Sequence, residues 1–467
     1  MPGSVRVPGS AIQRVIAVAA AAVLVLGCAA AASAATSGAG SSRQYWVATN
    51  GSASNANTDC ATARYSTVQS AVTAAEGATA RAIPTIEICP GTYQEQVTIT
   101  KSLNVVHAPR SGRVTIEGLA APVGSTSNCQ ATDTASQVPQ SVIEICGAKP
   151  GGKNSTGVEV GISRVTVEGD WAANVCNDNL YGILVEGGAA LNLAASVVEN
   201  VGADPLTSAG GCQGGVGIEA GYSYTNQIGH VLLDHDTIRG YQKNGVTADG
   251  AGSDALVANS TVTGAGATPY IAQNGIQIST GARGLVIGST ISGNNYTGTG
   301  EASSTGVLVY GGGSTCSGGD PQSGLVRNTG ISGNTLINND IGIALFNLNP
   351  GCDKSAATPT RDTACYNTIS NSHGYPGGVA SADANISGLV TSSGYVGDQA
   401  GVSDTGNRDT ICHNKISGAG YQPRDKASSL PNPPKPAWVR PVDIYSFAAA
   451  INPQVSGNRY DGKPYNP

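Results

Sequence analysis

Short runs in which apolar and polar residues alternate recur along most of the chain. One phrase consists of a Thr-like residue, an aliphatic residue, a polar residue and then Gly or Asn, and it occurs at residues 115–118, 166–169, 237–240, 261–264, 290–293, 336–338, 368–371 and 416–418. A second phrase, Gly followed by Ile or Val, interleaves with it and begins at residues 182, 217, 245, 275, 306 and 342. Successive members of the second phrase lie 35, 28, 30, 31 and 36 residues apart. A period of this length is typical of a solenoid.

The alternation has a period of two and is bounded by turn-forming Gly and Asn, so it predicts β-strands and excludes helical repeats. Parallel strands are then expected to stack coil on coil, about 4.8 Å apart. The composition of 467 residues agrees, with 64 Gly and only 12% charged residues. Asn334, Asn367, Asn414 and Asn458 lie just before or within strands of the first phrase. We interpret them as an amide ladder or as left-handed turns that satisfy backbone groups.

The two ends of the stack carry different signals. Ser66 and Gln69 form a capping-box-like start to an amphipathic helix that runs to about Glu76 and is expected to cover the N-terminal end. Near the other end, a proline-rich loop at about residues 428–441 precedes strand-like residues 458–460. We therefore expect an N-terminal segment at 35–85 that carries the helix, followed by one elongated domain at 86–467 with about nine or ten coils.

The first residues have the features of a secretory signal. Arg6 and Arg14 precede or flank an apolar run at 15–26, and Ala32, Ser33 and Ala34 follow as a cleavage site, which predicts a signal peptide at residues 1–34. The run is too short for a membrane anchor, so no transmembrane segment is expected in the mature chain. Residues 25–28 are also similar to a bacterial lipobox, in which Cys28 would carry a lipid. Either route predicts a secreted or extracytoplasmic protein.

Without Cys28, ten of the 11 cysteines remain, and an even number in an oxidising compartment favours disulfides over metal ligation. The cysteines fall into neighbouring couples along the sequence. Five local disulfides are therefore predicted: Cys60–Cys89, Cys129–Cys146, Cys176–Cys212, Cys316–Cys352 and Cys365–Cys412.

The formal net charge of −6 argues against a nucleic-acid partner or an anionic membrane surface, and it would weakly repel a polyanionic glycan. No sequence feature indicates an organic cofactor. A monomer is the favoured oligomeric state.

Two segments near the N-terminus, residues 65–72 (YSTVQSAV) and 86–95 (IEICPGTYQE), resemble the opening of bacterial β-helix proteins of the pectin-lyase-like superfamily, pectinesterases included. The resemblance covers about 60 residues and implies an all-β fold, a single-stranded right-handed parallel β-helix. Residues 231–237 (VLLDHDT) are also similar to a stretch of pectate lyases. The catalytic motifs of pectinesterases, polygalacturonases and pectate lyases are missing, so no catalytic residue carries over from these families.

A candidate ligand site follows from the strand periodicity. Residues two and four after each Gly of the second phrase are expected to point away from the core, beside the residue before Gly. In the middle coils these positions combine amides, hydroxyls, a carboxylate and an aromatic ring, and they are Asn244, Thr247, Asp249, Asn274, Gln277, Ser279 and Tyr310. The mixture suits a sugar, whose hydroxyls need polar partners and whose ring has an apolar face. A solvated sheet face would give nearly the same residues.

The densest ionisable cluster of the repeats is Asp234, His235 and Asp236 with Arg239. Alternation would send Asp234 and Asp236 to one face and His235 to the other, so that the two carboxylates could share Ca²⁺ or act as a catalytic pair. The alternative is that Asp236 occupies the turn position that Asn334 and Asn367 hold in other coils.

Two classes of function follow. A non-catalytic protein would bind polysaccharide on the stacked surface or serve a purely structural role. A carbohydrate hydrolase, lyase or esterase would use an outer carboxylate, for which Asp234, Asp236 and Asp249 are the candidates.

Overall fold

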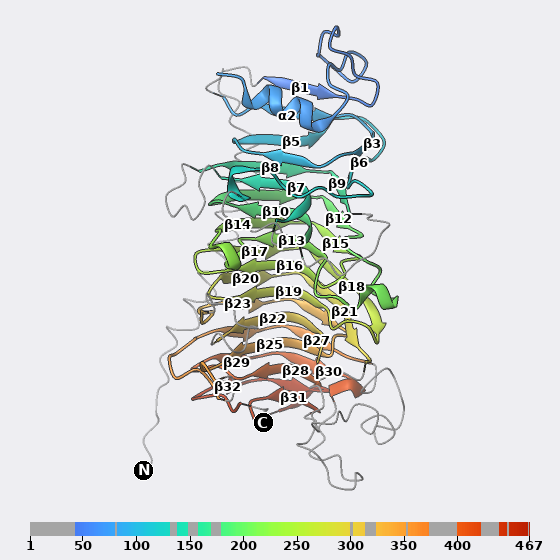
Figure 1. Ribbon diagram of the computed structural model, residues 1–467. Coiled ribbons are helices and arrows are strands. Elements are labelled where there is room, and N and C mark those ends of the chain that lie inside the picture. Colours follow the sequence, from blue (N-terminus) through green and yellow to red (C-terminus); the bar gives the residue numbers. More distant parts are fainter. Residues whose placement is uncertain are drawn as a thin grey trace, which may run out of the picture. The chain divides into compact units, whose positions relative to one another are not determined.

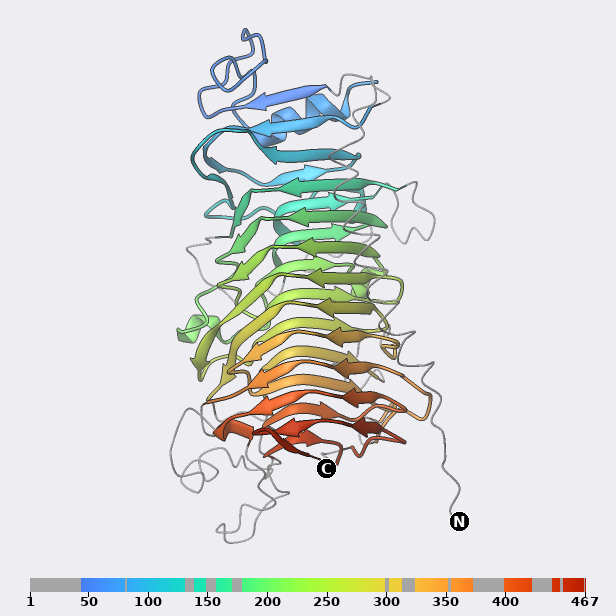
Figure 2. The ribbon, with the colours of Figure 1, turned by 180° about the vertical axis from the view of Figure 1, so that it is seen from behind.

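The computed structural model describes residues 43–79, 82–130, 138–147, 157–169, 179–298, 302–312, 324–351, 354–372, 399–421, 439–445, 448–465 and 467. Residues Gln44–Pro467 form one compact unit. Its strands lie in three sheets, A, B and C, and every pair of neighbouring strands is parallel except the last pair of sheet B (Figures 1 and 2). After the first coils the chain visits sheets C, A and B in turn, and it returns to each sheet one strand further along.

The bounds of the elements are as follows. Sheet A consists of β1 (Gln44–Val47), β2 (Thr85–Ile88), β5 (Leu103–His107), β8 (Glu159–Ser163), β11 (Ala189–Ala194), β14 (Gly229–Asp234), β17 (Asp254–Ala258), β20 (Arg283–Ile287), β23 (Gly330–Ser332), β26 (Thr363–Cys365), β29 (Thr410–Cys412) and β32 (Gln454–Ser456). Sheet B consists of β3 (Gly91–Gln94), β6 (Val114–Glu117), β9 (Thr166–Glu168), β12 (Val197–Glu199), β15 (Thr237–Arg239), β18 (Thr261–Thr268), β21 (Thr290–Tyr296), β24 (Thr335–Ile337), β27 (Thr368–Ser370), β30 (Lys415–Ser417), β33 (Arg459–Tyr460) and β34 (Lys463–Pro464). Sheet C consists of β4 (Val97–Ile99), β7 (Gln140–Cys146), β10 (Leu180–Glu186), β13 (Val216–Ala220), β16 (Asn244–Asp249), β19 (Asn274–Ser279), β22 (Thr305–Gly311), β25 (Ile341–Asn347), β28 (Gln399–Asp404) and β31 (Val439–Asp443). The helical elements are α2 (Val68–Glu76) and the short 3-10 helices η1 (Asn128–Gln130), η2 (Ser208–Gly211), η3 (Ser223–Thr225) and η4 (Ala419–Tyr421).

This architecture is the parallel β-helix with a short N-terminal helix that the sequence predicts. The first repeated phrase forms the strands of sheet B and the second forms those of sheet C. The aliphatic residues of the first phrase stack in register and are at most 2% exposed, in the column Val198, Ile238, Val262, Ile291, Leu336, Ile369 and Ile416. Burial of each such side chain stabilises the fold by about 1.5–3 kcal/mol.

The three corners differ in length. From β8 onward, the connection from sheet A to sheet B has two residues in every coil. From β8 onward, among the connections whose residues are all described, the connection from B to C ranges from three residues between β24 and β25 to 16 between β12 and β13. Among the connections whose residues are all described, the connection from C to A ranges from two residues between β10 and β11 to eight between β13 and β14. Only the corner between sheets A and B therefore repeats without insertion.

A column of glycines explains the second phrase. Gly182, Gly217, Gly245, Gly275 and Gly306 lie at equivalent positions near the start of sheet C strands, and a Cβ on any of them would lie 2.5–2.6 Å from the carbonyl oxygen of the next glycine of the column. The same Cβ would also meet the aliphatic column of sheet B. A larger residue would therefore force two coils apart.

The N-terminal helix is anchored by side chains of the first coils. Thr67 is its N-cap and accepts a hydrogen bond from the Ser70 amide (3.2 Å), so the expected cap at Ser66 was wrong by one residue. The Glu95 carboxylate accepts from the amides of Val68 (2.7 Å) and Gln69 (2.8 Å), which satisfies the free donors of the helix N-terminus. The buried Val68, Ala71, Val72 and Ala75 join the core.

Six of the described cysteines pair as predicted. Cys60–Cys89, Cys129–Cys146 and Cys365–Cys412 form disulfides, and Cys212 is also disulfide-bonded. Its predicted partner Cys176, and the predicted pair Cys316–Cys352, lie outside the described residues.

The proline-rich segment ends earlier than expected. Its residues 428–438 lie outside the described part of the chain, but Pro441 lies within β31 and not in a loop. This strand is the last of sheet C. An edge strand tolerates proline because one side of it needs no backbone donor.

None of the helices in the described ranges is both long and apolar enough to cross a lipid bilayer. The leader predicted at residues 1–34 lies outside these ranges.

Replacement of Gly275 by Ala is expected to destabilise the fold by about 1–3 kcal/mol or more, because the added methyl group overpacks two coils. Urea unfolding followed by circular dichroism measures the effect. Gly77→Ala is the matched control, because Gly77 has a φ of −74° and its nearest neighbour would lie 3.4 Å from the new Cβ. Equal stability of the two variants would contradict the packing argument.

Candidate functional site

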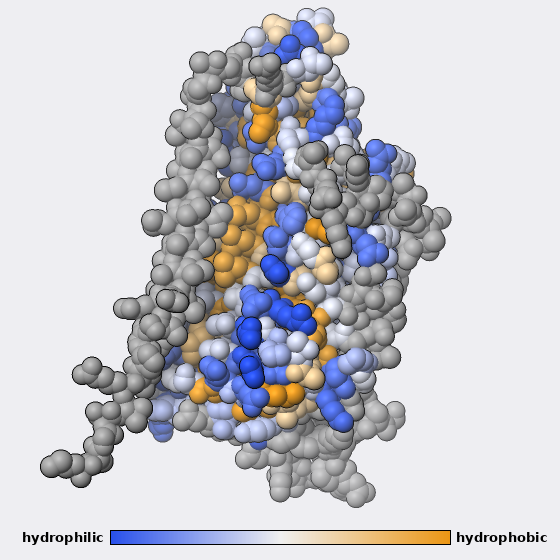
Figure 3. Space-filling model, turned by 90° about the vertical axis from the view of Figure 1, so that its left-hand side faces the viewer, coloured by the Kyte–Doolittle hydropathy of each residue, from blue (hydrophilic) through white to orange (hydrophobic). Residues whose placement is uncertain are grey.

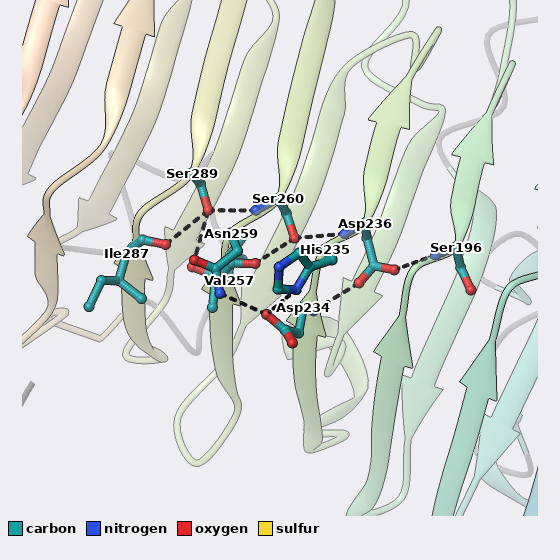
Figure 4. Close-up of polar contacts among 10 residues, drawn as sticks. Ser196, Asp234, His235, Asp236, Val257, Asn259, Ser260, Ile287 and Ser289 are labelled. Atoms are coloured by element: carbon teal, nitrogen blue, oxygen red, sulfur yellow. Dashed lines mark hydrogen bonds and ion pairs between the residues drawn. The ribbon is translucent and has the colours of Figure 1, made fainter. Parts of the chain in front are cut away.

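The ionisable cluster found in the sequence lies at the corner between sheets A and B, where a ladder of polar side chains runs through the stack (Figure 4). At each step a backbone amide of one coil donates to a side-chain oxygen of the next coil. The ladder consists of Ser196, Asp236, Ser260, Ser289, Asn334, Asn367, Asn414 and Asn458. Its donor–acceptor distances are 2.8–3.1 Å. Asp236 thus holds the position that Asn334 and Asn367 hold in later coils.

Asp234 and Asp236 do not share a face. Asp236 is 2% exposed and accepts the amides of Ser196 (2.8 Å) and Asp234 (2.9 Å). The Asp234 side chain is 36% exposed and pairs with the His235 ring at 2.9 Å. The expected alternation fails because His235 adopts a left-handed conformation with a φ of 62°, which turns the chain at this point.

Burial raises the pKa of Asp236 to about 7. The hydrogen bonds from the backbone amides of Ser196 and Asp234 lower this pKa in part, and the charge of the Asp234 side chain raises it further. Within the described ranges, no group of three or more His, Cys, Asp or Glu side chains is arranged to hold a metal ion.

The second candidate site lies on the outer face of sheet C. Its predicted residues come together on the adjacent strands β16, β19 and β22, whose register pairs Asn244 with Asn274, Thr247 with Gln277 and Ser279 with Tyr310. Six of them form one hydrogen-bonded network: Asn244, Thr247, Asp249, Asn274, Gln277 and Ser279. Asn274 donates to Asn244 (3.0 Å) and to Gln277 (3.1 Å), and it accepts from Thr305 (2.7 Å).

Many hydrogen-bond donors and acceptors of the network are already paired with one another. Both amide hydrogens of Asn244 are directed to Thr247 and Gln277. Asn244, Thr247, Asn274 and Ser279 are only 2–6% exposed, which differs from the solvent exposure expected for outward positions. Neighbouring side chains cover them because adjacent strands bring large polar groups side by side. Asp249, Gln277 and Tyr310 are half-buried and remain accessible.

Carboxyl groups of three neighbouring strands meet at the N-terminal side of this network. Glu186 of β10 and Glu219 of β13 are 0% and 5% exposed, and Asp249 of β16 accepts from the Ser223 amide (2.9 Å), Ser279 (3.0 Å) and Thr280. Burial raises the pKa of Glu219 well above its usual range, with further contributions from the charges of Asp249 and Glu186. Glu219 therefore favours its protonated form more strongly than an exposed glutamate does.

Three tyrosines border the carboxyl groups. Tyr181 and Tyr222 are 6.4 Å apart between ring centroids, and Tyr222 and Tyr224 are 5.6 Å apart. Tyr224 is 56% exposed. The connection between β13 and β14, which includes η3, brings Tyr222 and Tyr224 to the carboxyl groups. Sequence reasoning placed Glu219 on the outer face but missed this grouping, because a loop position has no periodicity.

The outer face of sheet A has a different character. Leu232, Leu256 and Leu285 form a half-buried apolar row in register. Beside it, His230 and Asp254 form an ion pair at 2.7 Å. Sheet A lies on the left of Figure 1, and Figure 3 faces that side and shows an apolar patch among polar residues. This face offers fewer polar partners for a sugar than sheet C does.

Comparisons with known proteins give fold-level likeness only. No family model matches the chain, and no curated protein matches it. Among solved structures, the chain is similar to the Dettilon tailspike protein at 13% identity and a TM-score of 0.42, over 84% of this chain and 66% of that one, or about two thirds of its length. It is similar to XylC in complex with xylose at 11% identity and a TM-score of 0.45 (80% and 69% covered), and to carrot pectin methylesterase at 10% identity and a TM-score of 0.35 (89% and 90% covered). None of these likenesses assigns an activity to this chain.

Replacement of Asp236 by Asn is expected to stabilise the protein above pH 7 and to flatten its pH dependence. With a pKa of about 7 in the folded state against 3.8 in the unfolded chain, the native protein keeps a proton that the unfolded chain has lost. Stability therefore falls by up to about 1.4 kcal/mol per pH unit between these values as pH rises. Asn cannot titrate, and its Oδ1 can accept the Ser196 amide as Asn does at four other ladder positions, whereas its Nδ2 cannot accept the Asp234 amide.

Urea titrations at pH 5, 6, 7 and 8 measure this effect, with Glu159→Gln as the control, because Glu159 is exposed on sheet A. A variant whose pH dependence matches the wild type would rule out Asp236 as its source.

Proposed function

We propose that the protein binds a neutral polysaccharide along the outer face of sheet C. The observation that carries the proposal is the alignment of accessible side chains of three kinds on neighbouring strands. Asp249 and Gln277 supply hydrogen-bonding groups, and Tyr310 and Phe346 are in register on β22 and β25 and supply aromatic surface. Sugars need both, because their hydroxyls require polar partners and their ring carbons form an apolar face.

The charge of this face supports a neutral ligand. Glu186, Glu219 and Asp249 lie within one electrostatic group, and each raises the pKa of the same neighbour, Tyr181. Within the described ranges, no salt bridge joins Glu219 or Asp249 to a basic residue. An anionic polysaccharide would add charge of the same sign at this site.

Cleavage of the bound polysaccharide is a second candidate function, and the raised pKa of Glu219 beside Asp249 favours it. A protonated acid and a neighbouring carboxylate are the two groups that glycoside hydrolysis requires. In this proposal Glu219 donates a proton to the glycosidic oxygen, and Asp249 activates water or stabilises the positive charge that develops on the sugar ring.

Replacement of Tyr310 by Ala is expected to weaken polysaccharide binding by about fivefold, because lost ring contact is worth about 1 kcal/mol. Affinity electrophoresis in gels that contain xylan, laminarin, dextran or polygalacturonate measures this loss. Ile337→Ala is the control, since Ile337 is a 36% exposed residue on sheet B. Retardation by polygalacturonate alone, or an unchanged Tyr310→Ala variant, would refute binding of a neutral chain at this face.

Variants Asp249→Asn and Glu219→Gln are expected to keep polysaccharide binding and to lose any release of reducing ends, because an amide keeps the shape of the carboxyl group but cannot exchange its proton. Reducing-end assays on the polysaccharide that the wild type binds provide the measurement, with Asp254→Asn as the control. Binding without turnover in the wild type would leave the binding function and remove the hydrolytic one.

A further inference from the structure

The corner between sheets A and B also carries a column of residues beside the polar ladder. This column is separate from the outer face of sheet C. The residue immediately before each member of the polar ladder adopts a left-handed conformation and points outward. From His235 onward this outer column consists of His235, Asn259, Gly288, Gly333, Tyr366, His413 and Gly457, with φ values from 50° to 69°. Most of these residues are types that tolerate the conformation, but Tyr is not, and it costs about 1–2 kcal/mol there.

Tyr366 and His413 form a rigid aromatic stack. Their ring centroids are 5.0 Å apart and their planes differ by 13°. The residues directly before them, Cys365 and Cys412, are in register on β26 and β29 and are joined by a disulfide. The two rings are therefore fixed on coils that are covalently joined at this corner.

The two outer faces of the Tyr366–His413 ring pair have different surroundings. On the C-terminal side, the His413 ring occupies the space that a Cβ of Gly457 would need. On the N-terminal side, Gly333 is the preceding residue of the column, and a Cβ built there would meet no atom within 4 Å. The next side chain of the column, Asn259, leans toward Gly288 and ends 3.1 Å from where that Cβ would lie. No side chain of the column therefore covers the N-terminal face of Tyr366.

The surroundings of this open face are neutral and polar. Tyr366 is 44% exposed. Ser332 of β23 and Thr335 of β24 flank Gly333 on sheets A and B, and Thr368 of β27 is exposed beside Tyr366. An open ring face flanked by hydroxyl groups matches a pyranose ring, whose carbon face stacks on the tyrosine and whose hydroxyls reach the flanking side chains.

We propose that Tyr366 is the platform of a second saccharide-binding site, located at the corner between sheets A and B and separate from the outer face of sheet C. The site requires neither the proposed binding at sheet C nor any catalytic activity. It binds a single neutral pyranose unit of a longer chain by ring stacking. Two contacts on one protein would raise the avidity for a long polysaccharide without raising the affinity of either site.

Two substitutions test the site without disturbing the ladder. Tyr366→Asn removes the ring and introduces the residue that the column already has at Asn259. Gly333→Asn keeps the ring and places a side chain over its open face, in the direction in which Asn259 leans. Ala195→Asn is the matched control, because Ala195 also has a left-handed conformation, with a φ of 51°, at a distant coil of the same column.

The experiment uses the full disulfide-bonded chain in affinity gels with xylan, laminarin, dextran or hydroxyethylcellulose, each variant being made in the wild-type and Tyr310→Ala backgrounds. In the Tyr310→Ala background, both test variants are expected to reduce the remaining retardation by about fivefold, and the control is expected to leave it unchanged. Thermal unfolding of every variant verifies the fold.

A stack with only a structural role predicts a different result. Gly333→Asn would then leave binding unchanged while Tyr366→Asn lowered the melting temperature, and this pattern overturns the proposal. A wild-type chain that none of the four polysaccharides retards also overturns it. Loss of retardation in Tyr310→Ala alone, with no further effect of the two test variants, would leave sheet C as the binding face and remove the second site.

Discussion

Hydrogen bonding in register between successive coils is the constraint on which the rest of this structure depends. Because each strand pairs with the strand one coil away, a residue meets the residues at the same position of the neighbouring coils. When one position requires a particular kind of residue, the same requirement recurs in the neighbouring coils, and the residues that meet it form a column. The glycines of sheet C, the aliphatic residues of sheet B and the polar ladder at the corner are three such columns, and in each of them one misfit disturbs the coils on both sides.

The fold could be predicted from the sequence because a column is visible as a repeated phrase. Gly245 and Gly275 indicate the start of sheet C strands, and Asn334 and Asn367 indicate the polar ladder. The same logic explains why Asp236 was ambiguous. It occupies a ladder position, but an aspartate next to Asp234 and His235 also resembles a catalytic cluster, and only the left-handed turn at His235 separates the two interpretations.

The candidate site was predicted in part. Strand periodicity placed Asp249, Gln277 and Tyr310 on one face, where the structure has them. It did not indicate how strongly the amides of Asn244 and Asn274 bond to each other, since that depends on distances between coils. It also missed the contribution of Tyr222 and Tyr224, which come from a connection whose path no periodic pattern describes. Burial then raises the pKa of Glu219, which its residue type alone does not predict.

From β8 onward, the connection between sheets A and B always has two residues, whereas the lengths of the connections at the other two corners vary from coil to coil. An inserted residue between sheets A and B would move every later ladder side chain out of line with its partners, so the amides of the ladder would lose their acceptors. The corners on either side of sheet C carry only short runs of such bonds, for example from the Thr329 amide to Asp362 and from the Asp362 amide to Asp409. From β8 onward, and where all their residues are described, these corners range from two to 16 residues. Residues can be added or lost at these corners while the stack remains intact. A scaffold of this kind can therefore acquire new loops around sheet C, and with them new ligand preferences, without a change in its folding pattern.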